Sequence, residues 1–412
     1  MAVYAQGMHV QLKPQRELLL LLTLAGIQFT HIVDFMIMMP LGPQLTALFG
    51  ISLAEFGLLV SAYTVAAGMS GLFATTFVDR FDRRRLLLLL YVMFALSTVA
   101  CALAPSYSLL LMARIASGFF GGVLSTMSQT IIGDVIPFDR RGRATGIVMT
   151  SFSVATVAGV PAGLFFANLW GWHYAFIGIG CLCLLMGVLA YFSVPSLKTH
   201  IAHGQDKHLL HAMAQVLREP NQRMALMLSG TMMFAAFTIV PYITLYIQTN
   251  EVMALQDIPW LYFCGGLVTL FTGRWVGGVT DRLGKRKTFQ RALLFSMVPM
   301  FIVTLLVPMP LPWVLLVTTT MFFAMNARMI PGMALLTSAA DPKFRGTFMS
   351  LNGAVQSFAM GVAAWVGGLL LHREPSGHVT QYWMCAVVAS AASLLAYQLA
   401  GKVVLHGQAN HG

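Results

Sequence analysis

Twelve long apolar stretches run through this chain of 412 residues and leave little sequence between them. A run of about 20 apolar residues is long enough to cross the hydrocarbon core of a membrane as an α-helix. Hydrophobic residues make up 58% of the chain and charged residues only 9%, whereas soluble domains carry about a quarter charged residues. The sequence therefore predicts an all-α membrane protein with twelve transmembrane helices. The expected spans are residues 18–46, 52–78, 86–104, 108–132, 144–168, 173–194, 223–248, 260–279, 288–307, 313–338, 345–371 and 380–402.

A charged segment after the second apolar stretch recurs after the eighth. The first copy reads Asp-Arg-Phe-Asp-Arg-Arg-Arg at residues 79–85, and the second reads Asp-Arg-Leu-Gly-Lys-Arg-Lys at residues 281–287. Such a repeat predicts two pseudo-symmetric six-helix bundles with a shared site between them, an arrangement that suits rocking-type alternating access. We expect an N-terminal bundle over residues 1–194, a cytoplasmic linker with a short amphipathic helix over 195–222, and a C-terminal bundle over 223–412.

The positive charge of the chain is a signal of membrane topology. The net charge is +11, but 21 of the 25 Lys and Arg residues fall in the tails or in loops after even-numbered helices. Because basic loops stay in the cytoplasm, both termini are expected there, in a multi-pass protein of the cell inner membrane. This distribution argues against a nucleic-acid partner.

Cysteine and histidine spacing gives no indication of a metal or cofactor site. The five Cys residues all lie inside apolar runs, where a small thiol packs as an apolar side chain. Four His residues fall in the linker at spacings that fit no tight metal site. We therefore expect no cofactor and no resident metal.

The charged loops resemble the signature of the major facilitator superfamily, and the resemblance covers essentially the whole chain. That signature is a Gly, three residues, Asp-Arg, any residue, Gly and then basic residues. The second copy matches it fully from Gly277, whereas the first has Thr75 and Asp82 where Gly is usual. In the family this loop latches the cytoplasmic side through ion pairs. The resemblance implies latch roles for Asp79, Arg80, Arg83, Asp134, Asp281 and Arg282.

Two further segments look like the drug:proton antiporter branch of that family. Arg114 begins an Arg-x-x-x-Gly segment in the fourth span, and the resemblance links this Arg to proton coupling. In the fifth span, Gly159, Pro161 and Gly163 resemble the Gly/Pro segment of antiporters, with Val160 where the family has Gly. Small residues let helices approach closely, and Pro permits a bend. We expect a packing hinge at these three positions.

Ionisable residues within the spans are candidate functional groups, because a charge at mid-helix costs about 2.5–3.5 kcal/mol on insertion scales. Asp34 lies in the first span with His31 three residues before it, on the same helix face. Desolvation disfavours the charged form of a buried carboxyl, so Asp34 could bind a proton near neutral pH. Arg328 in the tenth span stays charged. It is expected either to anchor an anionic group of a substrate or to pair with Asp34.

Neutral polar residues complete the expected substrate cavity beside Arg328. They are Gln28, Tyr63, Gln129, Tyr242, Asn326, Asn352 and Gln356. Together these features predict a proton-coupled secondary transporter that exports small organic molecules by alternating access, with lipid and protons as its other partners, acting as a monomer. Uptake of a metabolite or metal ion by proton symport is the alternative, and a membrane sensor that does not transport is a third. The sequence contains no nucleotide loop or nucleophile motif, so an enzyme is not expected.

Overall fold

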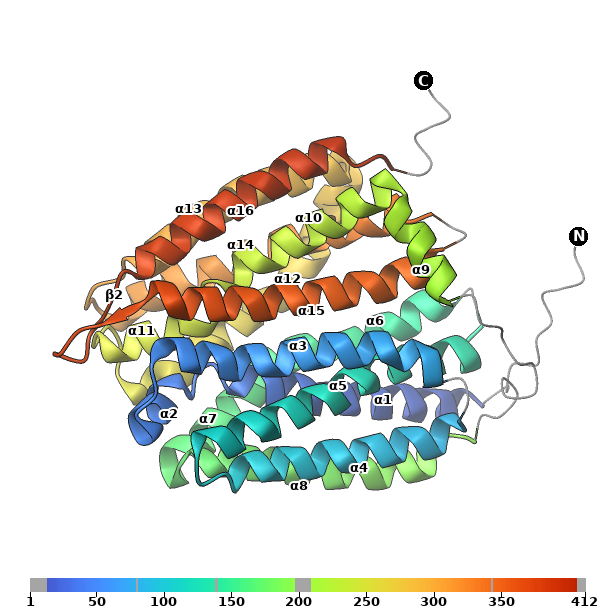
Figure 1. Ribbon diagram of the computed structural model, residues 1–412, viewed down its shortest axis with the longest axis horizontal. Helices are drawn as coiled ribbons and strands as arrows, with labels where there is room; N and C mark the ends of the chain where they lie inside the picture. Colours follow the sequence, from blue (N-terminus) through green and yellow to red (C-terminus); the bar gives the residue numbers. More distant parts are fainter. Residues whose placement is uncertain (1–12, 79–80, 138–139, 197–208, 342–343, 406–412) are drawn as a thin grey trace, which may run out of the picture.

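The computed structural model describes residues 13–78, 81–137, 140–196, 209–341 and 344–405. Two helical bundles lie against each other along their length, with α3 and α15 side by side at the contact (Figure 1). The N-terminal bundle consists of α1 Pro14–Ile37, α2 Gly42–Phe49, α3 Leu53–Phe77, α4 Arg83–Ala102, α5 Tyr107–Val135, α6 Arg141–Val154, the π-helical turn η3 Ala155–Gly159, α7 Val160–Trp170 and α8 Trp172–Ser193.

A short helix in the expected linker, α9 Leu209–Arg218, precedes the C-terminal bundle. It packs against α10 and α15, and Val216 is fully buried there. The C-terminal bundle consists of α10 Pro220–Phe237, the short helix η5 Val240–Tyr242, α11 Ile243–Thr249, the short helix η6 Leu255–Asp257, α12 Ile258–Leu283, α13 Lys285–Thr304, α14 Leu311–Ala339, α15 Arg345–Leu370, the hairpin β1 His372–Arg373 and β2 Val379–Thr380, and α16 Tyr382–Lys402.

The expected twelve-span architecture is confirmed. In the described residues, ten segments are long and apolar enough to cross a membrane, two of them composed of successive helices at Arg141–Trp170 and Pro220–Thr249. Helices α12 and α13, of 26 and 20 residues, complete the twelve. The first turns of α13 hold Lys285, Arg286 and Lys287, which lower its hydropathy without shortening it.

Three of the spans are less regular than the sequence pattern indicated. In the first span, helix α1 ends at Ile37 and the chain becomes helical again in α2, after Pro40. The fifth span contains the π-helical turn η3, and the helix of the seventh span is interrupted before Pro241. The common cause is Pro, which lacks a backbone N–H and prevents continuation of the i to i−4 hydrogen bonds. Pro161 is the second residue of α7, which follows the π-helical turn, a feature that often marks functional sites.

The closest contacts between the bundles occur where glycines meet backbone atoms. A Cβ on Gly57 would lie 2.7 Å from the carbonyl oxygen of Ala364, and one on Gly368 would lie 2.5 Å from that of Leu53. These contacts join α3 to α15 near the end of the molecule that carries α2 and α11. Because only Gly allows such an approach, this end of the interface is closed by backbone packing.

The other end of the molecule carries the charged loops, and we refer to it as the basic end. Here an added Cβ on Gly146 of α6, Gly277 of α12 or Gly353 of α15 would meet nothing within 4 Å. By contrast, a Cβ on Gly266 of α12 would lie 2.8 Å from Val157 in the opposite bundle. Close approach of the bundles therefore extends from the end with α2 and α11 past the middle of α3, where a Cβ on Gly68 would lie 2.7 Å from Ser357 of α15.

Gly122→Ala should destabilise the N-terminal bundle, because the new Cβ would lie 2.2 Å from the carbonyl oxygen of Ala67 on α3. Overpacking typically costs about 1–3 kcal/mol. Gly133→Ala in the same helix is the matched control, since nothing lies within 4 Å of its Cβ. Thermal unfolding of the purified protein in detergent should show a lower midpoint for Gly122→Ala alone. Equal midpoints for the two variants would contradict this account of the packing.

Candidate functional site

An ion pair between α1 and α5 is fully buried in the N-terminal bundle. The Nη1 atom of Arg114 lies 2.9 Å from the Oδ2 atom of Asp34, and both side chains are 0% exposed. The same nitrogen donates to the backbone carbonyl of Asp34 at 3.1 Å. Each charge thus offsets part of the cost of burying the other, a cost that either residue alone would bear in full.

The polar groups of this pair are incompletely satisfied. Oδ1 of Asp34 and both Nε and Nη2 of Arg114 are buried and have no hydrogen-bond partner in the structure. Buried polar atoms without partners are uncommon in folded proteins and indicate a strained or functional site. The pair therefore retains capacity for a proton, a water molecule or a polar group of a ligand.

Tyr63 of α3 connects the ion pair to His31. Its ring lies over the guanidinium of Arg114 at 4.4 Å, a cation–π contact. Its hydroxyl lies 2.8 Å from Nδ1 of His31 and donates to the backbone carbonyl of His31 at 3.3 Å. A Cβ on Gly121 would lie 2.7 Å from that hydroxyl, so a small residue in α5 leaves room for Tyr63.

An aromatic row leads from this group to the other bundle. The ring of Tyr63 stacks with Phe35 at 5.4 Å between centroids, and Phe35 stacks with Phe237 of α10 at 5.9 Å. His31 and Phe35 are half-buried, whereas Asp34 is not exposed. Only the side chains of Tyr63 and Phe35 therefore separate the ion pair from Phe237 in the opposite bundle.

The expected hinge segment packs against the part of α1 that carries Asp34. A Cβ on Gly159 would lie 2.3 Å from Val33, and one on Gly163 would lie 2.8 Å from Ile37. Gly159 ends the π-helical turn and Pro161 is near the start of α7. Glycine at both positions allows this irregular segment to contact α1 directly on either side of Asp34.

The structure places Arg328 away from Asp34. Arg328 points into the interior of the C-terminal bundle, where its Nη1 atom lies 3.5 Å from the hydroxyls of Ser296 and Ser393. Along α14 it is 17 residues from the first residue, Leu311, or about 26 Å at 1.5 Å per residue. Arg114 is seven residues, or about 10 Å, from the start of α5. The expected alternative of a direct Asp34–Arg328 pair is wrong, because Arg114 occupies that position.

Several of the expected substrate residues bond within their own bundle. Gln28 donates to Ser125 at 3.4 Å, and Gln356 donates to Ser229 at 2.8 Å. Tyr242 donates to the carbonyl of Ala364, beside the closed interface. Apart from Tyr63, three of these residues remain: Nε2 of Gln129 and Oδ1 of Asn352 are buried without a hydrogen-bond partner, and Asn326 is half-buried.

The expected latch residues lie at the basic end, although Asp79 and Arg80 are outside the described residues. Nε of Arg83 lies 3.0 Å from Oδ2 of Asp134, an ion pair between α4 and the last turn of α5. Asp281 and Arg282 are exposed at the end of α12. The structure therefore joins one pair of the expected latch residues.

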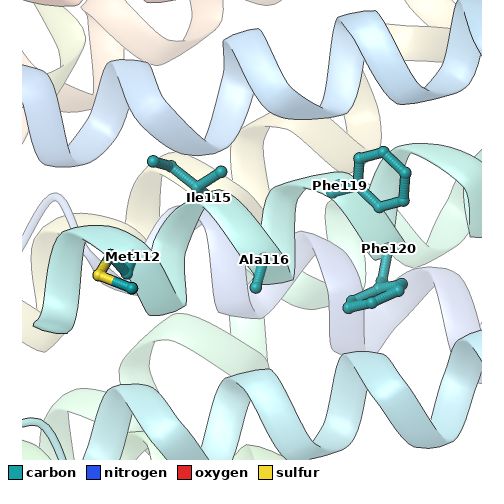
Figure 2. A pocket seen from close by; sticks show the side chains of 5 residues that line it. All are labelled: Met112, Ile115, Ala116, Phe119 and Phe120. Carbon is teal, nitrogen blue, oxygen red and sulfur yellow. The ribbon is translucent and has the colours of Figure 1, made fainter.

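The outer face of α5 is apolar and forms a shallow groove. Its volume is about 440 Å³, and its lining side chains extend along α5 (Figure 2). Arg114 and Gly118 lie on the buried side of the same helix. At a membrane-spanning depth, such a surface is suited to contact with lipid. The residues that line the groove are Met112, Ile115, Ala116, Phe119 and Phe120.

Sequence reasoning identified the members of the buried site but missed their pairing. It assigned Arg114 to proton coupling and Tyr63 to the substrate. In the structure Arg114 forms an ion pair with Asp34, and Tyr63 contacts both Arg114 and His31. The signal that could have shown this pairing was the depth of each residue along its own helix. Asp34 is three residues before the end of α1, and Arg114 is seven after the start of α5, so both lie toward the same end of the bundle. In the described residues, no three His, Cys, Asp or Glu side chains could hold a metal ion.

Comparisons with known proteins agree with this architecture. The chain is 23% identical to the uncharacterized MFS-type transporter YbcL of Bacillus subtilis (strain 168) over 88% of this chain and 91% of that protein. It is 24% identical to the inner membrane transport protein YdhP of Escherichia coli (strain K12) over 85% of this chain and 88% of that protein.

Solved structures share the fold at low sequence identity. A bacterial homologue of the human lysosomal transporter Spinster, inward-facing and occupied, has a TM-score of 0.76 and 16% identity over 96% of this chain and 98% of its own. The xylose transporter XylE from E. coli, in a partially occluded inward-open conformation, has a TM-score of 0.72 and 17% identity over 93% of this chain and 98% of its own. The sequence profile of the Major Facilitator Superfamily matches residues 24–364. The chain therefore belongs to this superfamily and is a multi-pass membrane transporter, not an enzyme.

Proposed function

We propose that this transporter exchanges protons for a small organic molecule and exports that molecule by alternating access. The observation that carries the proposal is the fully buried Asp34–Arg114 ion pair. An ionisable pair at membrane depth is costly and is typical of proton relays. The Gly159–Gly163 segment supports the antiporter direction, because it resembles the antiporter hinge and packs on α1 at Val33 and Ile37.

In this proposal Asp34 carries the proton. When Asp34 is ionised it holds Arg114 at 2.9 Å. Protonation removes the negative charge, so the guanidinium loses its main attraction and keeps only the backbone carbonyl of Asp34 and the Tyr63 ring as neutral contacts. His31 is half-buried and bonded to Tyr63, which makes it the route for protons between the space outside the bundle and the buried pair.

Substrate contacts are proposed for the neutral amides, which lie nearer the basic end than Asp34 and Arg114 do. Gln28, Gln129, Asn326, Asn352 and Gln356 offer both donors and acceptors. The positions of Tyr63 and Tyr242 support other roles, in proton coupling and in bundle packing. Arg328 lies too deep within the C-terminal bundle to support its expected role as an anchor for anionic substrates.

The basic end is proposed to face the cytoplasm, with the chain acting as a monomer in the inner membrane. The loop charges support this orientation, because basic loops are retained on the cytoplasmic side. The ion pair of Arg83 with Asp134 is proposed to belong to a latch that forms and breaks as the basic end closes and opens. Asp79, Arg80, Asp281 and Arg282 are its other proposed members.

Asp34→Asn should abolish transport driven by a pH gradient and preserve exchange of substrate across the membrane at equal pH. The amide keeps the shape of the side chain but cannot gain or lose a proton. A ligand is first found by thermal-shift screening of organic cations, anions and neutral compounds. Both transport modes are then measured in proteoliposomes, with Glu374→Gln in the exposed β-hairpin as the control. Undiminished proton-driven transport in Asp34→Asn would reject the assignment.

The direction of movement distinguishes exchange from uptake by symport. In proteoliposomes with an imposed pH gradient, an antiporter moves its substrate against the direction of proton flow, whereas a symporter moves it in the same direction. We expect opposite movement for the unmodified protein. Accumulation of substrate on the side to which protons flow would instead establish symport.

Arg114→Gln should destabilise the protein by about 3–5 kcal/mol, because it leaves a buried carboxylate unpaired. The double variant Asp34→Asn/Arg114→Gln should lose less than the sum of the two single variants, since no charge is then buried alone. Unfolding of all four proteins at one pH completes the cycle. Additive losses would show that the two charges are not energetically coupled.

Tyr63→Phe should shift the pH dependence of transport while leaving the substrate KM nearly unchanged. Phe retains the ring over Arg114 but cannot bond Nδ1 of His31, so proton delivery changes and packing does not. His31→Gln should shift the pH profile in the same sense, because it removes the titrating partner of the same hydrogen bond. A raised KM with an unaltered pH profile would instead place Tyr63 in the substrate site.

A further inference from the structure

Arg328 is a buried cation at the meeting point of α10, α13, α14 and α16. Its side chain is 0% exposed, and its Nη2 atom donates to the carbonyl of Met232 at 3.4 Å. Its Nη1 atom contacts the hydroxyls of Ser296 and Ser393 at 3.5 Å and the sulfur of Met300 at 3.8 Å. All of these contacts come from uncharged groups.

No carboxylate of the described residues lies within ion-pair distance of Arg328. The contrast with Arg114 is direct, because that residue has a carboxylate at 2.9 Å. Hydrogen bonds from a guanidinium to a true counter-charge are about 2.7–2.9 Å long, well below the 3.4–3.5 Å found here. A charge buried in this way is strongly unfavourable unless something neutralises it.

Two buried donors at this place in the bundle have no acceptor. Nε of Arg328 is buried and has no hydrogen-bond partner, and the same is true of the Ser390 hydroxyl. Ser390 lies three residues before Ser393 on α16, on the same face of the helix. Ser393 accepts from the guanidinium, which leaves its own O–H available to donate. These N–H and O–H groups form a buried cluster that suits an anion.

We propose that the Arg328 cluster binds a small monovalent inorganic anion, with chloride as the abundant candidate, as an internal counter-charge of the C-terminal bundle. The burial limits the size of the ligand, because Ser296 and Ser393 are 0% exposed and Ser390 only 7%. An organic carboxylate could enter only if the four helices separated. The site is distinct from the Asp34–Arg114 pair and does not depend on proton exchange there.

The test is the thermal unfolding of the purified full-length protein in detergent, with sodium chloride replaced stepwise by sodium gluconate at constant ionic strength. An anion that binds the folded state should raise the midpoint in proportion to the logarithm of its concentration once that exceeds the Kd, by about 2–4 °C at about 100 times the Kd. Arg328→Gln should lose this dependence on chloride. Arg140→Gln is the matched control, because Arg140 is 52% exposed and should leave the dependence intact.

An equal effect of chloride on all three proteins would overturn the proposal, because it would reflect a general effect of salt. Insensitivity of the unmodified protein to chloride would also overturn it, as would stabilisation by organic carboxylates alone. If Arg328→Gln does not fold, crystals of the unmodified protein grown in bromide give the answer. Anomalous scattering from bromide beside Arg328 supports the site, and its absence in an ordered bundle rules it out.

Discussion

The attraction between two opposite charges in a medium of low dielectric is the interaction around which the N-terminal bundle is organised. A single charge at mid-membrane costs about 2.5–3.5 kcal/mol on insertion scales, so Asp34 and Arg114 are tolerated chiefly because they meet at 2.9 Å. The meeting requires α1, α3 and α5 to approach closely, which explains the glycines of α5. A proton on Asp34 would cancel that attraction. The same contact therefore stabilises the bundle and offers a place where protonation can alter it.

The two halves share a scaffold but differ in their buried charges. Helices α5 and α14 are both 29 residues long and begin 204 residues apart, at Tyr107 and Leu311. The position in α14 equivalent to Arg114 is then Thr318, whose hydroxyl bonds only to carbonyls of its own helix. The two halves show a similar difference at the basic end. Arg83 of the N-terminal half contacts a carboxylate, whereas Lys285 of the C-terminal half contacts the hydroxyl of Ser338 at 2.5 Å. A repeated fold thus holds a buried ion pair in one half and an isolated cation in the other.

Most of the fold could be predicted from the sequence, because membrane helices are specified by local composition. Span boundaries such as 52–78 and 345–371 correspond closely to α3 Leu53–Phe77 and α15 Arg345–Leu370. The breaks near Pro40 and Pro241 were less predictable, since apolar residues continue through them. Candidate site residues were found for the same local reason: a charged side chain is conspicuous in an apolar run. Their partners were not found, because apolar periodicity does not show which way a side chain points in a helix buried on several sides.

The sequence by itself determined the class of protein, the number of spans and the set of ionisable groups placed at membrane depth. Each follows from the energy of transferring individual residues into lipid, which depends on local composition alone. Only the tertiary structure decided that Asp34 meets Arg114, that Tyr63 joins this pair to His31, and that Arg328 turns into its own bundle. Those outcomes depend on helix rotation and relative depth, which are set by the packing of side chains from segments far apart in the chain.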